Sequence, residues 1–221
     1  RQKIYELMGF DEFISFDNIK KYMDEDDIEY VRHYVSDRTS FKLVTDRLEN
    51  KKPGEKMFLF NVTMQNHGGY TYDGGEFPTV TISNLQGHYK EAEQYLSLIK
   101  ESDKAFEELV RYLKNYDEPT IVVMFGDHQP AVEQEFYEEL YGKSLSKLST
   151  EELQQRYKIP FVIWANYDIE SQDDLKTSPN YLSDLLLDTA NVPKNEIENF
   201  TSEVRNDVPQ INAMGHYDSD G

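Results

Sequence analysis

Two apolar runs of this sequence each lead into a polar loop that carries glycine and histidine. Residues 57–63 precede a loop that contains His67, and residues 120–125 precede Gly126-Asp127-His128. Ligands of open α/β sheets bind outside the carboxyl ends of the strands, so these loops are the first candidates for a site. Asp127 and His128 offer a carboxylate oxygen and an imidazole nitrogen, which suit one half of a divalent-metal site. If both loops lie at one edge of a sheet, they can hold one cation and one anion.

The histidines also have structural interpretations. An Asp-His pair is common, and both residue types occur in turns and helix caps; the position directly after an apolar strand makes a metal site an equal alternative. A single histidine such as His67 is more often an ordinary loop residue than a catalytic one. His88 is expected at or just before a long helix, in a structural or rim role, and no role is assigned to His33 or His216.

Two other segments invite a functional interpretation. The acidic run 23–27 lacks the alternating acidic residues, the central glycine and the terminal glutamate of an EF-hand, so a solvated loop or helix start is expected there. Residues 70–78 form either a lid over the site or a solvent loop, and the sequence leaves both open.

Three apolar runs of strand length predict the sheet that positions the two loops: 57–63, 120–125 and 159–165. Each is apolar on both alternating faces, which is typical of strands that are covered on both sides in an α/β sheet. A long helical pattern separates the first two runs and predicts a strand–helix–strand crossover. The apolar stripe of that helix is expected to comprise Ala92, Tyr95, Leu96, Ile99, Phe106, Leu109, Val110 and Leu113, and its polar face Glu91, Glu93, Lys100, Glu101, Lys104 and Glu107.

Shorter helices are predicted at residues 4–8, 40–48, 133–141, 150–157 and 180–189. Gly9 and Pro193 are the stop signals of the first and the last of these helices. Ser149 or Thr150, followed by Glu152, is expected to form an N-cap.

Composition excludes several classes of protein. The 221 residues include 23 Lys+Arg and 42 Asp+Glu, a net charge of −19 that argues against nucleic-acid binding and against a basic membrane-surface patch. Without cysteine there is no disulfide or thiol chemistry, so a metal site must use oxygen and imidazole ligands. The chain begins at Arg1 and contains no signal peptide or apolar span of membrane length, and we expect it to be part of a longer polypeptide.

Residues 58–70 and 122–128 together resemble the sulfatase-like family of the alkaline phosphatase superfamily, in particular lipoteichoic acid synthase and related phosphoglycerol transferases. The resemblance rests on the Asn-His loop and on the Gly-Asp-His motif after an apolar strand. It extends well over residues 55–192 and loosely over residues 1–54, while residues 193–221 are expected to form a C-terminal tail. The chain therefore resembles the C-terminal portion of one catalytic domain.

The resemblance implies a fold and a partial site. The fold would be an α/β alkaline-phosphatase-like sandwich, in which helices flank a mixed, largely parallel central sheet. Asp127 and His128 would be two ligands of a divalent ion, Mn²⁺ with Mg²⁺ or Zn²⁺ as alternatives, and His67 would bind the substrate phosphate. The threonine nucleophile and a glutamate ligand of the family would precede Arg1, so the fragment alone would be inactive.

The implied function is a two-step transfer of phosphoglycerol by a membrane-anchored parent protein, on the extracellular face of the bacterial cell membrane. The substrate would be a lipid or polymer that carries glycerol phosphate. Two alternatives stay open: a sulfuric- or phosphoric-ester hydrolase of the same superfamily, and an α/β module that binds a ligand without turnover. The sequence assigns no donor, acceptor or oligomeric state.

Overall fold

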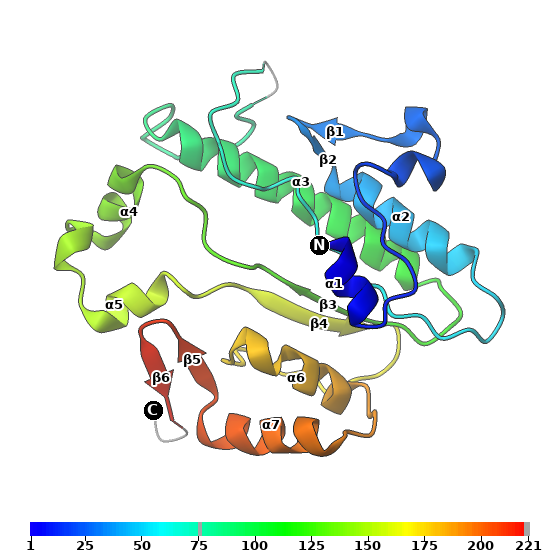
Figure 1. Cartoon of the computed structure of the whole chain (residues 1–221). Coiled ribbons are helices and arrows are strands. Elements are labelled where there is room, and N and C mark those ends of the chain that lie inside the picture. Colours follow the sequence, from blue (N-terminus) through cyan, green and yellow to red (C-terminus); the bar gives the residue numbers. More distant parts are fainter. Residues whose placement is uncertain (75–76, 219–221) are drawn as a thin grey trace. The chain divides into compact units, whose positions relative to one another are not determined.

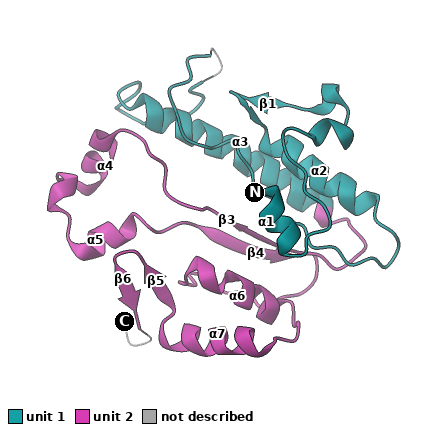
Figure 2. Ribbon diagram, in the orientation of Figure 1, with its two compact units in different colours: residues 1–112 teal, residues 113–221 magenta. Residues whose placement is uncertain are grey.

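The computed structural model describes residues 1–74 and 77–218 (Figure 1). The chain divides into two compact units, Arg1–Tyr112 and Leu113–Gly221, which Figure 2 shows in teal and magenta. Strands in the described residues form three two-stranded antiparallel sheets. The mixed, largely parallel sheet that the resemblance implies therefore stays a prediction.

The first unit consists of short elements followed by two long helices. In order they are α1 (Gln2–Leu7), η1 (Ile19–Lys21), η2 (Glu25–Asp27), β1 (Tyr30–Val31), β2 (Tyr34–Val35), α2 (Asp37–Glu49) and α3 (Lys90–Leu113), the last residue of which belongs to the second unit. A small apolar core lies under the short elements and comprises Ile19, Met23 and Ile28, with Ile14, Val35 and Leu43 packed against them. In the acidic run 23–27, Glu25–Asp27 forms η2 and the four acidic side chains are exposed, as expected, whereas Met23 belongs to this core.

Helix α2 begins three residues earlier than predicted because Ser36 caps it. The Ser36 hydroxyl accepts a hydrogen bond from the backbone N–H of Thr39 at 3.0 Å. Helices α2 and α3 are joined by the bidentate pair between Arg38 and Glu108, whose shortest distance is 2.9 Å. The ion pair places the start of α2 close to the C-terminal part of α3.

Helix α3 forms where the periodicity predicts it, but its buried face differs from the predicted stripe. Leu96 and Ile99 are exposed, whereas Leu98 is fully buried. Glu93 was expected on the polar face and is instead completely buried, with 0% exposure. The prediction for these positions is wrong because polarity and periodicity do not show which groups elsewhere in the chain pack against the helix.

The burial of Glu93 follows from its hydrogen bonds to backbone. Its carboxylate accepts from the N–H groups of Ile82 and Gly87, each at 3.0 Å. One turn further, the Ser97 hydroxyl accepts from the N–H groups of residues 79 and 80 at 2.9 Å. Polar side chains of α3 thus satisfy the donors of an irregular loop, which makes their burial favourable.

The segment 70–78 is anchored to α3 at Tyr72. Gln94 accepts from the backbone N–H of Tyr72 at 3.3 Å and donates to its carbonyl at 2.6 Å. Residues 75–76 of this segment lie outside the described residues, and both interpretations of it, lid and solvent loop, stay open.

Residues 57–63 were predicted as a strand covered on both faces, and this is not what the structure has. No strand is formed at 57–63 in the described parts of the chain, and Phe58, Phe60 and Val62 are exposed. A strand forms only when a neighbour pairs with its backbone groups, and apolar patterning alone does not supply that neighbour.

The second unit is built around one strand pair. Its elements are β3 (Ile121–Phe125), α4 (Gln134–Tyr141), η3 (Leu145–Lys147), α5 (Thr150–Gln155), β4 (Phe161–Ala165), η4 (Pro179–Tyr181), α6 (Leu182–Thr189), α7 (Glu196–Asp207), β5 (Gln210–Asn212) and β6 (Gly215–Tyr217). Two of the three predicted strands are confirmed as β3 and β4, which pair antiparallel from Ile121 opposite Ala165 to Phe125 opposite Phe161. Their side chains are half-buried rather than fully covered, and Phe125 and Val162 are exposed. The N-cap of α5 is Ser149, which forms a capping box with Glu152.

Asn166 fixes the start of β3 beside the end of β4. Its amide nitrogen donates to the carbonyls of Leu113, Tyr116 and Glu118 at 3.0–3.2 Å, and its oxygen accepts from the N–H of Thr120 at 2.8 Å. One half-buried amide therefore closes the turn that leads into β3 and sets where that strand begins.

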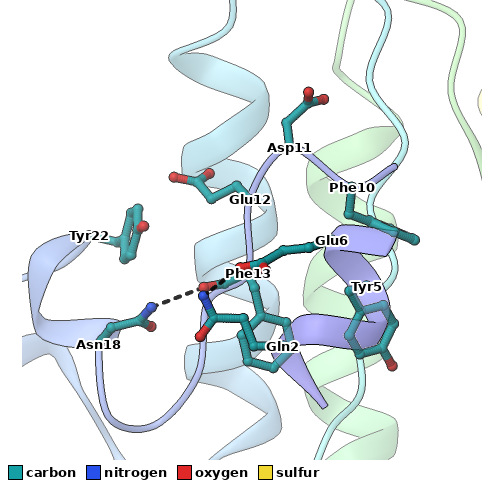
Figure 3. Close-up of a pocket in the computed structure, with 9 residues that line it drawn as sticks. All are labelled: Gln2, Tyr5, Glu6, Phe10, Asp11, Glu12, Phe13, Asn18 and Tyr22. Atoms are coloured by element: carbon teal, nitrogen blue, oxygen red, sulfur yellow. Dashed lines mark hydrogen bonds between the residues drawn. The ribbon is translucent and has the colours of Figure 1, made fainter. Parts of the chain in front are cut away.

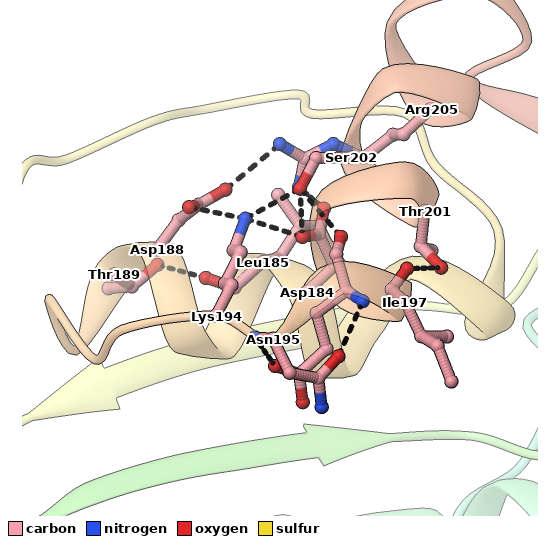
Figure 4. A network of polar contacts seen from close by, with 11 residues as sticks. Asp184, Leu185, Asp188, Thr189, Lys194, Asn195, Ile197, Thr201, Ser202 and Arg205 are labelled. Atoms are coloured by element: carbon pink, nitrogen blue, oxygen red, sulfur yellow. Dashed lines mark hydrogen bonds and ion pairs between the residues drawn. The ribbon is translucent and has the colours of Figure 1, made fainter.

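Helices α6 and α7 lie side by side and share a cluster of charges (Figure 4). Asp184 of α6 is paired with Lys194 and with Arg205 of α7, the latter at 2.8 Å. The same two cations also contact Asp188, at 2.5 and 3.0 Å. Part of the expected C-terminal tail thus forms α7, which is held to α6 by charge, and the β5–β6 hairpin.

Candidate functional site

His67 lies in an exposed loop, and the two residues before it belong to a polar network that is largely buried. The Ser102 hydroxyl of α3 donates to a carboxylate oxygen of Asp37 at 2.5 Å and accepts from the Asn66 amide at 2.7 Å. Gln65 is buried and accepts from the backbone N–H of Asp37 at 3.0 Å. The residues directly before His67 are thereby tied to the first turn of α2 and to the middle of α3.

The buried carboxylate of this network gives a testable pH dependence. Burial raises the pKa of Asp37 above its ordinary value of 3.8, although the hydrogen bond from Ser102 opposes the shift. The folded state then holds this proton more tightly than the unfolded chain, so stability falls as pH rises from 3.8 through the raised pKa. We expect the wild type to gain stability relative to Asp37→Asn when the pH is lowered from 7 toward 3.8.

Urea unfolding of both proteins across this pH range checks the expectation. Asp24→Asn, at an exposed aspartate of the same unit, serves as the control. The pH dependence of its unfolding free energy should follow that of the wild type more closely. A constant difference in unfolding free energy between wild type and Asp37→Asn would contradict it.

A second contact to the His67 loop comes from the β1–β2 hairpin. The Tyr34 hydroxyl lies 3.3 Å from His67 Nδ1, and the Arg32 guanidinium donates to backbone carbonyls of residues 65–69. Sequence reasoning assigned no role to Arg32 or Tyr34. Their contacts span more than 30 residues of sequence, and no local pattern signals such a contact.

Asp127 and His128 follow β3 directly, as predicted, and form an exposed pair. The carboxylate of Asp127 accepts from the backbone N–H of His128 at 2.9 Å, and its other oxygen lies 3.5 Å from His128 Nε2. Their side chains are 84% and 74% exposed. The residues on either side of the pair are hydrogen-bonded to the segment before β4. The Gly126 N–H donates to the Pro160 carbonyl at 3.2 Å, and the Gln129 side-chain amide donates to the Lys158 carbonyl.

The donor set of this pair fits a divalent cation. His128 Nδ1 lies 2.8 Å from the Gln129 carbonyl, which only accepts, so Nδ1 is the donor in this contact and Nε2 is the ring nitrogen that could bind a metal ion. Two ligands about 2.1 Å from one ion at a tetrahedral angle lie about 3.4 Å apart, close to the separation of Asp127 Oδ2 and His128 Nε2. Among the described residues, no group of three or more His, Asp or Glu side chains could hold a metal. The pair therefore supplies two ligands and not a complete site.

The structure does not test whether the two loops meet. His67 belongs to the first unit and the Asp127-His128 pair to the second, and each loop is defined within its own unit. Their convergence on one ion and one anion stays a prediction.

A cavity of about 340 Å³ in the first unit has a different character (Figure 3). Tyr5, Phe10 and Phe13 contribute rings to its wall, and Glu6, Asp11 and Glu12 contribute carboxylates. Such a wall repels phosphate and sulfate, and the cavity contains no histidine. It is not the site that the sequence predicts.

Comparison with known proteins places the chain in a family. The family model described as Sulfatase matches residues 1–192, and the chain belongs to this family. Enzymes of the family generally depend on a divalent metal ion, which agrees with the donor set of the Asp127-His128 pair.

Two curated relatives come from Rhizobium meliloti (strain 1021). The chain is 27% identical over 198 residues to the "Putative cyclic beta-1,2-glucan modification protein", a match that covers 86% of this chain and 29% of that protein. It is 29% identical over 130 residues to the capsular polysaccharide biosynthesis protein RkpI, covering 59% of this chain and 21% of that one. The chain thus spans less than a third of the length of these relatives.

The fold resembles that of a solved transferase. The Streptococcus pyogenes phosphoglycerol transferase GacH, solved in complex with sn-glycerol-1-phosphate, superposes with a TM-score of 0.71 at 22% identity. The superposition covers 95% of this chain and 51% of GacH, and it establishes a shared fold. Within the described residues, no helix has the length and apolar character needed to cross a bilayer.

Proposed function

We propose that this chain carries part of the active site of a metal-dependent phosphoglycerol transferase that acts on glycerol phosphate in phosphodiester linkage. The observation that carries the proposal is the geometry of Asp127 and His128, a carboxylate oxygen and an imidazole nitrogen 3.5 Å apart, directly after a strand in a chain of the sulfatase family. The fold shared with a phosphoglycerol transferase supports the choice of substrate class.

The residues of this chain would bind and orient. Asp127 and His128 would hold a divalent ion, Mn²⁺ with Mg²⁺ or Zn²⁺ as alternatives. When bound, such an ion activates a hydroxyl nucleophile and neutralises charge on the phosphoryl oxygens. His67 would donate a hydrogen bond to a phosphate oxygen of the substrate. The nucleophile and the remaining ligands would come from residues outside this chain, and the chain alone would be inactive.

The setting we propose is the extracellular face of the bacterial cell membrane, in a membrane-anchored protein. A net charge of −19 repels a polyanionic substrate at long range. Attraction must therefore be local, from the ion and from donors such as His67. The glycan- and capsule-related names of the two curated relatives support a role in modifying the cell envelope.

A pair of chromogenic substrates tests the proposal in the complete protein. With Mn²⁺ present, we expect turnover of a nitrophenyl glycerol phosphodiester and not of nitrophenyl sulfate. His67→Ala removes a hydrogen bond to a charged group, worth about 1.5–3 kcal/mol, so kcat/KM should fall about 10- to 100-fold. The matched control is His88→Ala, an exposed histidine of the same unit, which should leave turnover unchanged.

Each other outcome selects an alternative. Cleavage of the sulfate ester alone would identify a sulfatase, and free phosphate release from simple monoesters would identify a phosphatase. Turnover of neither class, with the protein folded and supplied with metal, would leave a ligand-binding module. Unchanged turnover in His67→Ala would remove His67 from the site.

A further inference from the structure

The β1–β2 hairpin presents one arginine to the loop that carries His67. Arg32 occupies the two-residue turn between β1 and β2 with φ of +57°, a left-handed conformation that tight hairpin turns require. The guanidinium carbon lies 5.3 Å from the centre of the Tyr34 ring and 5.6 Å from that of Tyr70. Two aromatic faces therefore hold the cation in place.

This one guanidinium binds three carbonyls of a single loop. One of its terminal nitrogens donates to the carbonyls of Gln65 at 2.7 Å and His67 at 2.8 Å, and the other donates to that of Gly69 at 3.0 Å. The planar guanidinium carries several N–H donors in a fixed arrangement and can make all three hydrogen bonds at once. The compact ammonium group of lysine is less suited to binding three carbonyls in this way. The backbone on both sides of His67 is thereby fixed in one conformation.

The same hairpin contacts the imidazole itself. The Tyr34 hydroxyl lies 3.3 Å from His67 Nδ1. A neutral imidazole has one donor and one acceptor nitrogen, so the partner of Nδ1 decides which role is left for Nε2.

We propose that the β1–β2 hairpin is the positioning element of the substrate-binding histidine, with Arg32 fixing the loop and Tyr34 setting the His67 tautomer. The Tyr34 hydroxyl donates to Nδ1, and Nε2 keeps its proton and presents it outward. A phosphate oxygen accepts hydrogen bonds, so only this tautomer is matched to the substrate at neutral charge. The inference rests on the proposed function of His67; Arg32 and Tyr34 are positioning residues that need not touch the substrate.

Tyr34→Phe is the sharpest test, because it keeps the ring beside Arg32 and removes only the hydroxyl. Nitrogen NMR of the complete protein, labelled with ¹⁵N at histidine, reports the tautomer of His67 without any substrate. We expect an unprotonated Nδ1 and a protonated Nε2 in the wild type, and a mixture of tautomers in Tyr34→Phe. Tyr72→Phe is the matched control, because it removes the hydroxyl of a tyrosine whose ring packs edge-on against a different histidine, His33.

Kinetics provide the second readout, on the glycerol phosphodiester. Tyr34→Phe should lower kcat/KM about 5- to 10-fold, the loss expected for one neutral hydrogen bond. Arg32→Lys keeps the charge but not the planar guanidinium, and should lower kcat/KM further, with circular dichroism unchanged.

The outcomes separate this inference from the proposed function. A wild-type His67 with its proton on Nδ1, or a tautomer that Tyr34→Phe leaves unchanged, would overturn the role of Tyr34. Arg32→Lys with wild-type kinetics would overturn the role of Arg32. If the NMR result is as expected but His67→Ala retains full turnover, the proposed role of His67 in substrate binding fails while the tautomer assignment holds.

Discussion

Asp184→Asn is expected to lower the free energy of unfolding by about 3–5 kcal/mol, the usual cost of removing one partner from a buried ion cluster. Asp184 is 1% exposed and is the shared partner of Lys194 and Arg205, which are themselves largely buried. Asparagine keeps the size and one acceptor but leaves both cations without their central counter-charge. Chemical denaturation followed by far-UV circular dichroism measures the loss, and hydrogen exchange localises it to α6 and α7.

Asp188→Asn is the matched control for this prediction. Asp188 contacts the same two cations but is 48% exposed, so water compensates most of its loss and the cost should stay below about 1 kcal/mol. If Asp188→Asn is as costly as Asp184→Asn, burial is not what makes Asp184 important.

The charge cluster also has a defined pH range. Burial raises the pKa of Asp188, but bonds from Lys194 and Arg205 outweigh it and lower the pKa below 3.8. Burial likewise lowers the pKa of Lys194, and its bonds to both aspartates outweigh this and raise it above 10.5. The stability that ionised Asp188 contributes is fully present above its unfolded pKa and is lost as the pH falls through the lowered pKa. The stability that protonated Lys194 contributes is fully present below its unfolded pKa and is lost as the pH rises through the raised pKa. The cluster should therefore stabilise α6 and α7 from about pH 4 to pH 10.

Asp127→Ala is expected to lower kcat/KM of the complete protein about 1000-fold and to weaken Mn²⁺ binding strongly. A bound ion supplies several kcal/mol of charge stabilisation, and about 4 kcal/mol corresponds to this factor. Titration calorimetry with Mn²⁺ measures binding without substrate. Because Asp127 is exposed and makes few contacts, its loss should leave the unfolding free energy nearly unchanged.

Asp168→Ala is the control for Asp127→Ala. Asp168 is exposed and follows the neighbouring strand β4, yet it has no histidine beside it in the sequence. Its loss should affect neither Mn²⁺ affinity nor turnover. Equal Mn²⁺ affinity in wild type and Asp127→Ala would assign Asp127-His128 to a structural turn and would remove this pair from the proposed metal site.

Much of the local structure was predictable from the sequence. Apolar runs marked β3 and β4, a three- and four-residue repeat marked α3, and Ser149 with Glu152 marked the start of α5. These features depend on residues that are close in the chain, whose spacing is visible in the sequence. For the same reason the Asp127-His128 pair could be located: both residues follow the same strand.

Other features were decided only by tertiary structure. Glu93 is buried because the irregular loop before its helix folds back and donates backbone N–H groups to it. Asp184 is buried because Lys194 and Arg205 contact it from beyond the end of its helix. Residues 57–63 have the composition of a strand but lack pairing in the described chain. Polarity and periodicity describe one residue and its near neighbours, whereas a buried charge or a strand depends on a partner elsewhere.

The sequence by itself determined which residue types stand where chemistry can occur: His67 in its loop and the Asp127-His128 pair after β3. The tertiary structure decided how His67 is held, through Arg32 and Tyr34 on a hairpin more than 30 residues earlier. A candidate motif is short, so its residues can be recognised in the chain. The groups that orient it are chosen by three-dimensional proximity, which sequence spacing does not encode.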